Sequence, residues 1–366
     1  MKITFVLPYA GLEGGIRVLA IYAKKLAERG HDVFVVSQPL GRPTLRDQVR
    51  SIVKHRRWKR APKPHESHFY GLSVPHRVLE CKRPVCDHDV PDADVIVATW
   101  WLTAEWVANL SPKKGAKAYF IQHHEVFDYA PKDRVRATWR LPMHKITISK
   151  WLVDLAREEY GDTDVSWVPN SVDMTQFHAP PRGRQPNPTV GLLYSNLGWK
   201  GCATSLAAFA QAAEKIPTLS LTAFGTSPPV DGIPLPPRTK FHLRPPQGRL
   251  KDIYASCDVW LCGSQSEGFH LPILEAMACR CPVVSTAVGG SVDAINHGVN
   301  GFIVPVGDTQ GLANGLIELF SIPESQWKSM SDAAYNTAIS YSWDDATAKF
   351  EDGLRLAIER RRAGVL

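Results

Sequence analysis

Two glutamates eight residues apart, Glu267 and Glu275, carry the clearest chemical signal in the chain. In the run Glu267-Gly-Phe-His-Leu-Pro-Ile-Leu-Glu275, Pro272 suits the first turn of a helix, where its fixed φ and missing amide hydrogen cost nothing. The run therefore predicts that Glu267 lies in a loop and Glu275 about one turn inside a helix. Three amides at the start of this helix lack intrahelical acceptors and, with the helix dipole, favour an anion. They belong to Phe269, His270 and Leu271.

Carboxylates beside an anion site fit a ligand that combines phosphates with sugars. The helix amides would hold a diphosphate, whose negative charge they favour. Glu267 and Glu275 would accept hydrogen bonds from the hydroxyls of a ribose or a hexose. The run therefore predicts a site for a sugar-bearing diphosphate.

The segments around this run alternate short apolar stretches with amphipathic helical stretches, which is the pattern of open parallel sheets. We expect strands in the first half at 3–7, 33–37, 95–99, 118–122, 145–149 and 166–169, and in the second half at 189–194, 219–224, 258–262 and 282–286. Helices are expected at about 16–29, from about 202, and at 343–362. The pattern predicts an α/β fold.

A break in this alternation falls at residues 179–188, which contain four prolines. Proline continues neither a helix nor a central strand, so we interpret this segment as a domain linker. A chain of 366 residues is long for one core and comfortable for two domains.

Composition indicates an ordinary globular protein, with 44% hydrophobic and 22% charged residues. The seven cysteines are an odd number scattered through apparent core elements, which favours free thiols in a reducing compartment. No segment reaches the roughly 20 apolar residues of a membrane span, and residues 3–7 are too short for a signal peptide. We therefore expect a cytoplasmic protein with at most peripheral membrane contact.

The net charge of +7 is concentrated around residues 50–63. The basic residues there are Arg50, Lys54, Arg56, Arg57, Lys59, Arg60 and Lys63, interrupted by Trp58. This cluster suits an anionic membrane surface or a phosphate-bearing acceptor, and equally a solvated loop. Nucleic acid is not expected, because no recognition motif accompanies the charge.

The glutamate run resembles the Glu-x7-Glu signature of retaining, nucleotide-sugar-dependent glycosyltransferases of family 4, and the resemblance continues through Pro282-Val-Val-Ser-Thr, Val288-Gly-Gly and Asn300-Gly-Phe-Ile-Val-Pro. It implies the GT-B fold, two Rossmann-like doubly wound domains facing a central cleft. The expected division is an acceptor-side domain at 1–178, the linker at 179–188, a nucleotide-sugar domain at 189–342 and a terminal helix at 343–366 that crosses back to the first domain.

The resemblance also implies roles for individual residues. Lys200, in Gly198-Trp-Lys200-Gly201, stands where family members carry a lysine that faces the donor diphosphate. His123, favoured over His124, stands where members carry a histidine that contacts the transferred sugar. His123, Lys200 and Glu267 are the expected catalytic residues. The expected donor-binding residues are Gly14, Gly15, Lys200, Arg244, Glu267, Gly268, Phe269, His270, Leu271 and Glu275.

The chain departs from the family pattern at three places. Most members have an arginine five or six residues before the lysine, where this chain has Tyr194 and Ser195. Arg17 and Arg244 are the candidates to replace that charge. His270 and Arg280 stand where glycines are usual, and a left-handed backbone at Arg280 would cost about 1–2 kcal/mol unless its side chain reached the helix-end carbonyls.

We expect transfer of a sugar from a UDP, GDP or dTDP sugar to a glycan, lipid-linked or small-molecule acceptor, in cell-surface polysaccharide or glycoconjugate synthesis. No cofactor and no metal are expected, since His123, His124 and Glu125 lack a convincing ligand set. Two alternatives stay open, a catalytically weak nucleotide-sugar-binding subunit and a sugar-nucleotide epimerase of the same fold. A second open point concerns Trp100, Trp101 and Trp106, which would either stack on an acceptor sugar or pack inside the domain.

Overall fold

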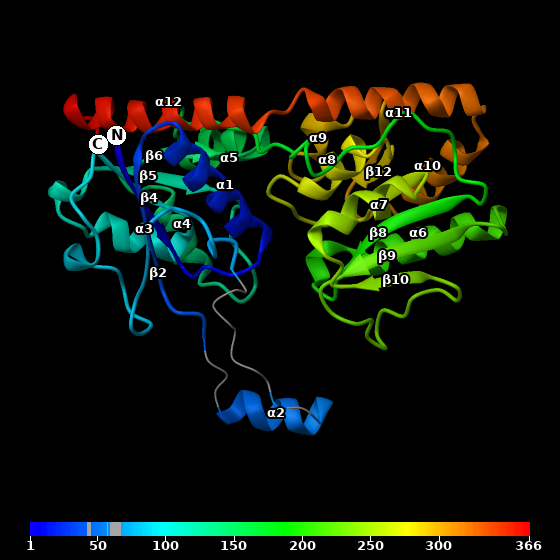
Figure 1. The fold of residues 1–366 in the computed structure, drawn as a ribbon, viewed down its shortest axis with the longest axis horizontal. Coiled ribbons are helices and arrows are strands. Elements are labelled where there is room, and N and C mark those ends of the chain that lie inside the picture. Colours follow the sequence, from blue (N-terminus) through cyan, green and yellow to red (C-terminus); the bar gives the residue numbers. More distant parts are fainter. Residues whose placement is uncertain (42–44, 57, 59–66) are drawn as a thin grey trace. The chain divides into compact units, whose positions relative to one another are not determined.

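The computed structural model describes residues 1–41, 45–56, 58 and 67–366, and the chain forms two compact units (Figure 1). Unit 1 consists of residues 1–147, 155–167 and 347–366, and unit 2 of residues 148–154 and 168–346. Each unit is built around its own parallel sheet.

Unit 1 carries, within the described residues, a seven-stranded parallel sheet of order β3-β2-β1-β4-β5-β6-β7. Its strands are β1 Lys2–Leu7, β2 Asp32–Ser37, β3 His76–Val78, β4 Val95–Ala98, β5 Ala116–Ile121, β6 His144–Thr147 and β7 Ser166–Trp167. All four residues of β4 are buried, as expected for a central parallel strand with both faces covered. Most of these strands match the segments predicted from the sequence.

The helices of unit 1 connect these strands. They are α1 Gly14–Glu28, α2 Leu45–His55, α3 Trp101–Ala108, α4 Lys132–Thr138 and part of α5 Lys150–Tyr160. Residues 347–366, most of α12 Trp343–Arg362, also belong to this unit. There Phe350 is fully buried and stacks on Tyr22 at 4.5 Å between ring centroids. The last segment of the chain is therefore part of the core of unit 1.

Unit 2 carries a six-stranded parallel sheet of order β10-β9-β8-β11-β12-β13. The strands are β8 Thr189–Tyr194, β9 Ser220–Gly225, β10 Lys240–Leu243, β11 Val259–Cys262, β12 Val283–Thr286 and β13 Gly301–Val304. The helices are α6 Cys202–Lys215, α7 Leu250–Ala255, α8 Leu271–Ala278, α9 Ser291–Ala294, α10 Thr309–Ser321 and α11 Glu324–Ile339. Buried side chains from β8, α6, α10 and α11 form one core, which includes Trp327.

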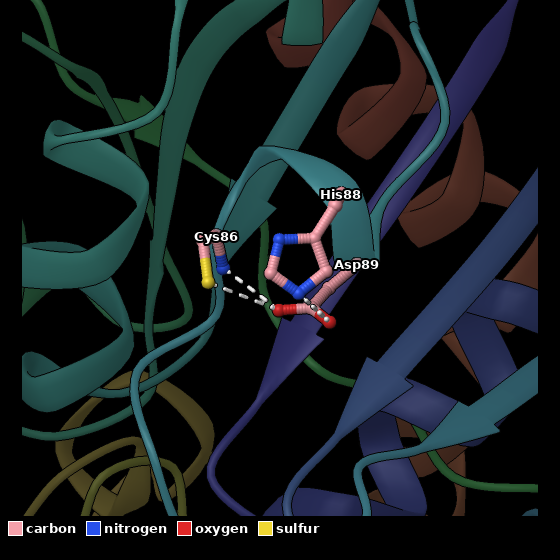
Figure 2. A group of neighbouring side chains, drawn as sticks. All are labelled: Cys86, His88 and Asp89. Carbon is pink, nitrogen blue, oxygen red and sulfur yellow. Dashed lines mark hydrogen bonds and ion pairs between the residues drawn. The ribbon is translucent and has the colours of Figure 1, made fainter.

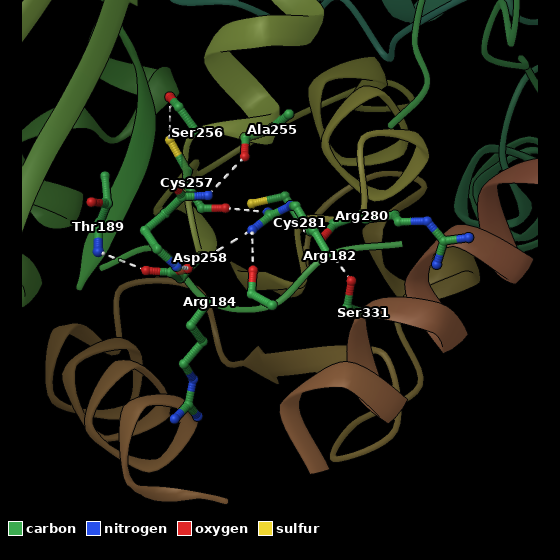
Figure 3. A network of polar contacts seen from close by, with 12 residues as sticks. Arg182, Arg184, Thr189, Ala255, Ser256, Cys257, Asp258, Arg280, Cys281 and Ser331 are labelled. Atoms are coloured by element: carbon green, nitrogen blue, oxygen red, sulfur yellow. Dashed lines mark hydrogen bonds and ion pairs between the residues drawn. The ribbon is translucent and has the colours of Figure 1, made fainter. Parts of the chain in front are cut away.

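The proline-rich segment 179–188, predicted as a linker, lies within unit 2. Its two arginines attach it there. Arg182 donates to the carbonyls of Cys257 and Arg280 (Figure 3). Arg184 donates to the carbonyl of Leu319. The Asp258 carboxylate also accepts from the backbone amide of Gln185 at 2.7 Å. The segment is irregular, as its prolines require, but it is bound to its unit by polar contacts.

Each sheet has a switch point where strand order reverses, between β1 and β4 in unit 1 and between β8 and β11 in unit 2. In open α/β sheets ligands bind beyond the carboxyl ends of the strands at such points. The loops that follow β1, β4, β8 and β11 are therefore the places to seek a site. No helix among the described residues is long and apolar enough to cross a membrane.

Candidate functional site

Lys200 and Glu267 meet at the switch point of unit 2. Lys200 ends the turn Gly198–Lys200 that follows β8, and Glu267 lies in the loop between β11 and α8. The Lys200 ammonium lies 3.0 and 2.8 Å from the two carboxylate oxygens of Glu267. Two of the three residues expected to be catalytic are thus brought into direct contact, although they are 67 positions apart in the chain.

The environment of Glu267 keeps it ionised although its side chain is only 8% exposed. Burial alone would raise the pKa of this carboxyl. Attraction to His270 in its protonated form and to Lys200, with hydrogen bonds from Lys200 and Ser264, reverses this effect and leaves the pKa below its ordinary value. Ser264 donates from Oγ to Oε1 at 2.8 Å, a contact that the sequence did not single out.

His270 occupies the N-cap position of α8 with a left-handed backbone, φ 76°. Its imidazole is buried, with Nδ1 3.0 Å from the hydroxyl of Ser291 and Nε2 3.9 Å from Glu267. Burial lowers the pKa of His270 to about 4, so the imidazole is neutral at neutral pH. The side chain that replaces the usual glycine therefore fills the space between Glu267 and α9 without adding charge.

Glu275 lies inside α8, as predicted, and Pro272 is in the first turn of that helix. The Glu275 carboxylate is buried and accepts a hydrogen bond from the hydroxyl of Tyr254 in α7 at 2.9 Å. This tyrosine follows no motif and was not predicted as a partner. Its bond fixes the orientation of the carboxylate that is expected to bind ribose.

Close backbone packing explains two glycine positions of the signature. Gly201 has φ 55°, and a Cβ there would lie 1.7 Å from the carbonyl oxygen of Gly263. Gly289, in Val288-Gly-Gly, has φ 51°, and a Cβ there would meet the carbonyl oxygens of Glu267 and Gly268 at 2.6 and 2.8 Å. Both glycines allow neighbouring backbone to lie against the loop that carries Glu267.

The position of the usual family arginine is taken by a structural tyrosine. Tyr194 is buried, donates to the carbonyl of Ile233 at 2.7 Å and accepts from the amide of Val230 at 2.9 Å. Arg244, one candidate to replace the charge, is exposed and donates from Nε to the carbonyl of Thr226 at 2.7 Å. Arg17, the other candidate, belongs to α1 of unit 1.

Arg280 has the left-handed backbone that its position predicts, φ 58°. Its side chain does not reach back to the carbonyls at the end of α8. It donates to the carbonyl of Ala179 at 3.1 Å, pairs with Asp332 and lies 4.2 Å from the ring centroid of Tyr335. Arg280 therefore ties segment 179–188 to α11, because its guanidinium offers donors in several directions.

In unit 1, the glycine loop and the loop after β5 lie against each other. Gly14 and Gly15 begin α1, and Gln122 donates from Nε2 to the carbonyl of Gly15 at 3.1 Å. A Cβ at Gly15 would lie 3.3 Å from the same amide nitrogen, whereas a Cβ at Gly14 would meet nothing within 4 Å. The structure thus joins the glycine pair to the segment that carries the predicted histidine.

The two histidines after β5 have different surroundings. His123 accepts at Nδ1 from the amide of Glu125 at 3.1 Å and stacks on Phe127, with 4.9 Å between ring centroids. His124 lies 2.7 Å from the Tyr160 hydroxyl, and burial lowers its pKa. His124 is therefore held by a structural contact inside the unit, which favours His123 as the residue that faces a ligand.

Glu125, for which the sequence predicted no role, is fully buried and caps α3. Its Oε2 accepts from the amide of Trp101 at 2.8 Å, and the hydroxyl of Tyr119 lies 3.4 Å from the same oxygen. Burial raises the pKa of Glu125 to about 8. The contacts of this carboxyl group hold the backbone next to His123 in place. Glu125 itself has a left-handed backbone, with φ 64°.

The three tryptophans after β4, Trp100, Trp101 and Trp106, differ in burial, which bears on whether they pack inside the domain or could stack on a sugar. Trp101 and Trp106 are buried in unit 1. Trp100 is only partly buried and stacks on Phe127, with 6.4 Å between ring centroids and an interplanar angle of 15°. Burial therefore accounts for Trp101 and Trp106, and a ligand-stacking role stays a prediction for Trp100.

One group of potential metal ligands comes together among the described residues: Cys86, His88 and Asp89 (Figure 2). Arg83 donates from two nitrogens to the Asp89 carboxylate, at 2.6 and 2.8 Å, and Asp89 also accepts from the amide of Cys86 at 2.9 Å. These bonds lower the pKa of Asp89, with the Arg83 hydrogen bond as the main cause. The group is a hydrogen-bonded turn whose carboxylate already has a cationic partner.

Residues 176–337 match the family model described as glycosyl transferases group 1. The D-inositol 3-phosphate glycosyltransferase of Thermobispora bispora is 34% identical over 115 residues, which are 31% of this chain and 27% of that protein. The N-acetyl-alpha-D-glucosaminyl L-malate synthase of Bacillus anthracis is 41% identical over 78 residues, 21% of this chain and 20% of that protein. The chain thus spans about a quarter of the length of these relatives.

The Anabaena protein HepE, solved in complex with UDP-glucose, superimposes with a TM-score of 0.72 at 18% identity, covering 97% of this chain and all of that one. The predicted GT-B fold is confirmed by this likeness and by the two parallel sheets. The predicted resemblance to family 4 glycosyltransferases is confirmed as well, through the group 1 match to residues 176–337 and the two relatives.

Proposed function

We propose that this chain is a retaining, metal-independent glycosyltransferase that moves a sugar from a nucleotide-diphospho-sugar to a glycan, lipid-linked or small-molecule acceptor. The observation that carries this proposal is the contact of Lys200 with Glu267 at the switch point of unit 2, beside the N-terminus of α8. The family match favours transfer over the two alternatives, an epimerase and a catalytically weak subunit.

A UDP-sugar is the donor class with most support. HepE, which shares the fold, was solved with UDP-glucose bound. In our proposal the diphosphate lies between the Lys200 ammonium and the amides of Phe269, His270 and Leu271, Glu275 accepts from the ribose, and Glu267 accepts from hydroxyls of the transferred sugar. A cation about 4 Å from a phosphate near a protein surface stabilises it by up to roughly 4 kcal/mol before desolvation.

The reaction breaks the bond between the anomeric carbon and the phosphate oxygen and forms a bond from that carbon to an acceptor oxygen. Negative charge develops on the departing diphosphate, where Lys200 and the α8 amides stabilise it. The acceptor hydroxyl loses its proton to the leaving phosphate on the same face of the sugar. This route retains the anomeric configuration and requires neither an enzymatic nucleophile nor a metal.

Thermal-shift titration of the full chain with UDP, GDP and dTDP and the matching sugars tests the donor site. A ligand at a hundred times its Kd stabilises by about 2.7 kcal/mol. We expect stabilisation by one nucleotide class, lost in Lys200→Met and kept in the control Lys240→Met, whose lysine is exposed on β10. No stabilisation of the wild type by any of them would sink the proposal. The anomeric proton coupling of the product, in buffer with EDTA, tests retention and metal independence.

We further propose that the chain contacts an anionic membrane through helix α2 and the segment 50–63, which overlaps the second half of that helix. The apolar residues Leu45, Val49, Ile52 and Val53 are all exposed. Their spacing places them on one face of α2. Arg46 and Arg50 are exposed beside them. The basic side chains of Lys54, Arg57, Lys59, Arg60 and Lys63 lie outside the described residues. An amphipathic helix with basic flanks lies in a bilayer interface.

Co-sedimentation with vesicles tests the membrane contact. We expect the chain to bind vesicles containing 30% phosphatidylserine and to bind pure phosphatidylcholine weakly. Val49→Ser with Val53→Ser removes the apolar face but no charge, and should lower binding roughly tenfold or more, because each buried apolar side chain contributes about 1.5–3 kcal/mol. Equal binding of wild type and double variant would overturn the proposal.

A further inference from the structure

Aromatic residues stand at matching positions beyond three neighbouring strands of unit 1. Tyr9 is two residues after β1, Trp100 two residues after β4 and His123 two residues after β5. These strands are adjacent and parallel in the order β1-β4-β5, so their carboxyl ends lie at one edge of the sheet. The topology therefore gathers three rings at the switch point, where a ligand is expected.

The loop after β5 adds two further rings and forms a stack. Phe127 lies 4.9 Å from His123 with an interplanar angle of 23°, and 6.4 Å from Trp100 with an angle of 15°. Tyr129 continues the stack, 5.3 Å from Phe127 with an angle of 9°. We call Tyr9, Trp100, Phe127 and Tyr129 the aromatic cluster.

Part of the aromatic cluster is accessible to a ligand. Tyr129 is 69% exposed and Tyr9 is 36% exposed, while Trp100 and Phe127 are partly buried. Burial raises the pKa of Tyr9 to about 12, with smaller contributions from the charge of Glu13 and from Tyr129, so Tyr129 lies near enough to Tyr9 to interact with it. Phe127 lies within the stack, whereas Tyr129 stacks on it and is largely exposed, so Tyr129 presents an aromatic face to a ligand at this edge.

We propose that the aromatic cluster binds the terminal sugar ring of the acceptor, stacked against the C–H face of that ring. This inference rests on the proposed transferase function and narrows its acceptor class. Pyranose rings present patches of C–H groups that carry partial positive charge, which complements the negative face of an aromatic ring. An open-chain acid such as malate offers no such face.

The order of the rings agrees with the proposed reaction. His123 ends the stack, and it is the residue that the family resemblance places against the transferred sugar. Its Nδ1 already accepts from the Glu125 amide, so in this contact Nε2 is the ring nitrogen that carries a proton. An acceptor sugar stacked on Tyr129 would lie in the same ring cluster of unit 1 as His123, and the chain would discriminate among acceptors by ring stacking.

Replacing Tyr129 by leucine tests the aromatic cluster directly. This side chain is exposed, so we expect the variant to fold like the wild type. Initial rates of transfer are measured with the donor that the thermal-shift titration identifies. The acceptors are the methyl glycosides of glucose, galactose, mannose and N-acetylglucosamine, with L-malate as the ring-free comparison. Tyr129→Leu should raise KM for the best glycoside roughly tenfold, since an aromatic contact contributes about 0.5–1.5 kcal/mol beyond its buried area.

Tyr129→Phe is the matched control, since it keeps the ring and should stay within about twofold of the wild type. Donor hydrolysis without acceptor should be unchanged in both variants. Phe127→Leu gives a second, independent loss. Unchanged KM in Tyr129→Leu, or faster transfer to L-malate than to every glycoside, would overturn the inference.

Saturation-transfer NMR of the same glycosides with the protein and UDP separates this inference from the proposed function. Binding that is seen in the wild type and lost in Tyr129→Leu supports the aromatic cluster even if no transfer occurs. Transfer without any dependence on Tyr129 supports the transferase and rejects the cluster. Absence of glycoside signal in the wild type rejects it as well.

Discussion

The Lys200 ammonium touches both carboxylate oxygens of Glu267, at 3.0 and 2.8 Å. The group proposed to hold the donor phosphate and the group proposed to hold the donor sugar therefore neutralise each other before any donor binds. Donor binding exchanges part of this contact for phosphate and hydroxyl contacts. The pair keeps a buried carboxylate ionised, and it prepares a cation for the departing diphosphate.

Lys200→Met should reduce kcat/KM for transfer by about 10²–10³-fold, because a preorganised group opposite developing charge contributes this much. Stability should fall by less than about 2 kcal/mol, because the Lys200 side chain is 29% exposed and its charge pair is partly screened by water. Steady-state kinetics and urea unfolding measure the two effects, with Lys240→Met as control. A loss of activity that only matches a loss of folded protein would contradict the assignment.

Glu125→Gln should change the pH dependence of stability. The pKa of Glu125 is raised to about 8 in the folded protein, so the folded state binds more protons than the unfolded state between pH 4.5 and 8. The contribution of Glu125 to the free energy of unfolding of the wild type therefore falls as pH rises through that window, by at most roughly 4–5 kcal/mol. Gln keeps an acceptor for the amide of Trp101. The stability difference between variant and wild type, from urea midpoints at pH 5 to 9, should move in favour of Glu125→Gln with rising pH. A difference that is flat across this range would contradict the shift.

Gly201→Ala and Gly14→Ala should behave oppositely. Alanine at Gly201 meets the carbonyl oxygen of Gly263 and has φ 55°, so it should lower stability by about 3 kcal/mol or more. Alanine at Gly14 meets nothing within 4 Å and should leave stability unchanged or raise it by about 0.4–1 kcal/mol. Thermal unfolding measures both. If Gly14 lies at the donor phosphates as predicted, Gly14→Ala weakens donor binding at full stability, and unchanged donor affinity would remove it from the site.

Arg280→Gly should destabilise unit 2 although it restores the residue that the backbone prefers. Relief of the left-handed strain contributes about 1–2 kcal/mol. Loss of the contacts with Ala179, Asp332 and Tyr335 costs more, about 2–4 kcal/mol, because a bond to a charged donor contributes about 1.5–3 kcal/mol and ring contact adds to it. Urea unfolding should show a net loss of about 1–2 kcal/mol. A gain in stability would mean that strain dominates at this position.

The positions of Lys200 and Glu267 in the unit 2 site could be predicted from the sequence, because each residue lies in the segment that follows a predicted strand of the sheet. Lys200 and Glu267 each follow a strand, and those strands flank the switch point, so the alternation of strands and helices brings them together. The partners of two other residues of this site, Glu275 and His270, were not predictable. Tyr254 and Ser291 come from other segments, and their contacts depend on side-chain packing that no local pattern encodes.

Two further positions mark the limit of sequence reasoning. The left-handed backbone at Arg280 follows from the helix that ends beside it, but the direction of its side chain is set by α11. The prolines of 179–188 predict irregular backbone. The attachment of this segment to unit 2 depends on Arg182 and Arg184, which donate to carbonyls distant in the sequence. Short-range sequence patterns therefore predict the backbone conformation of such a segment. They do not predict which part of the protein the segment packs against, because long side chains determine that.

The fully buried ring of Phe350 has a consequence for how the chain is made. Phe350 packs on Phe5, Tyr22 and Phe120, rings from the first third of the chain. During synthesis these rings leave the ribosome long before residue 350 exists. The first unit therefore stays incomplete, with an apolar surface open, until translation has passed through the whole of the second unit, and it reaches its final core only once the last helix arrives.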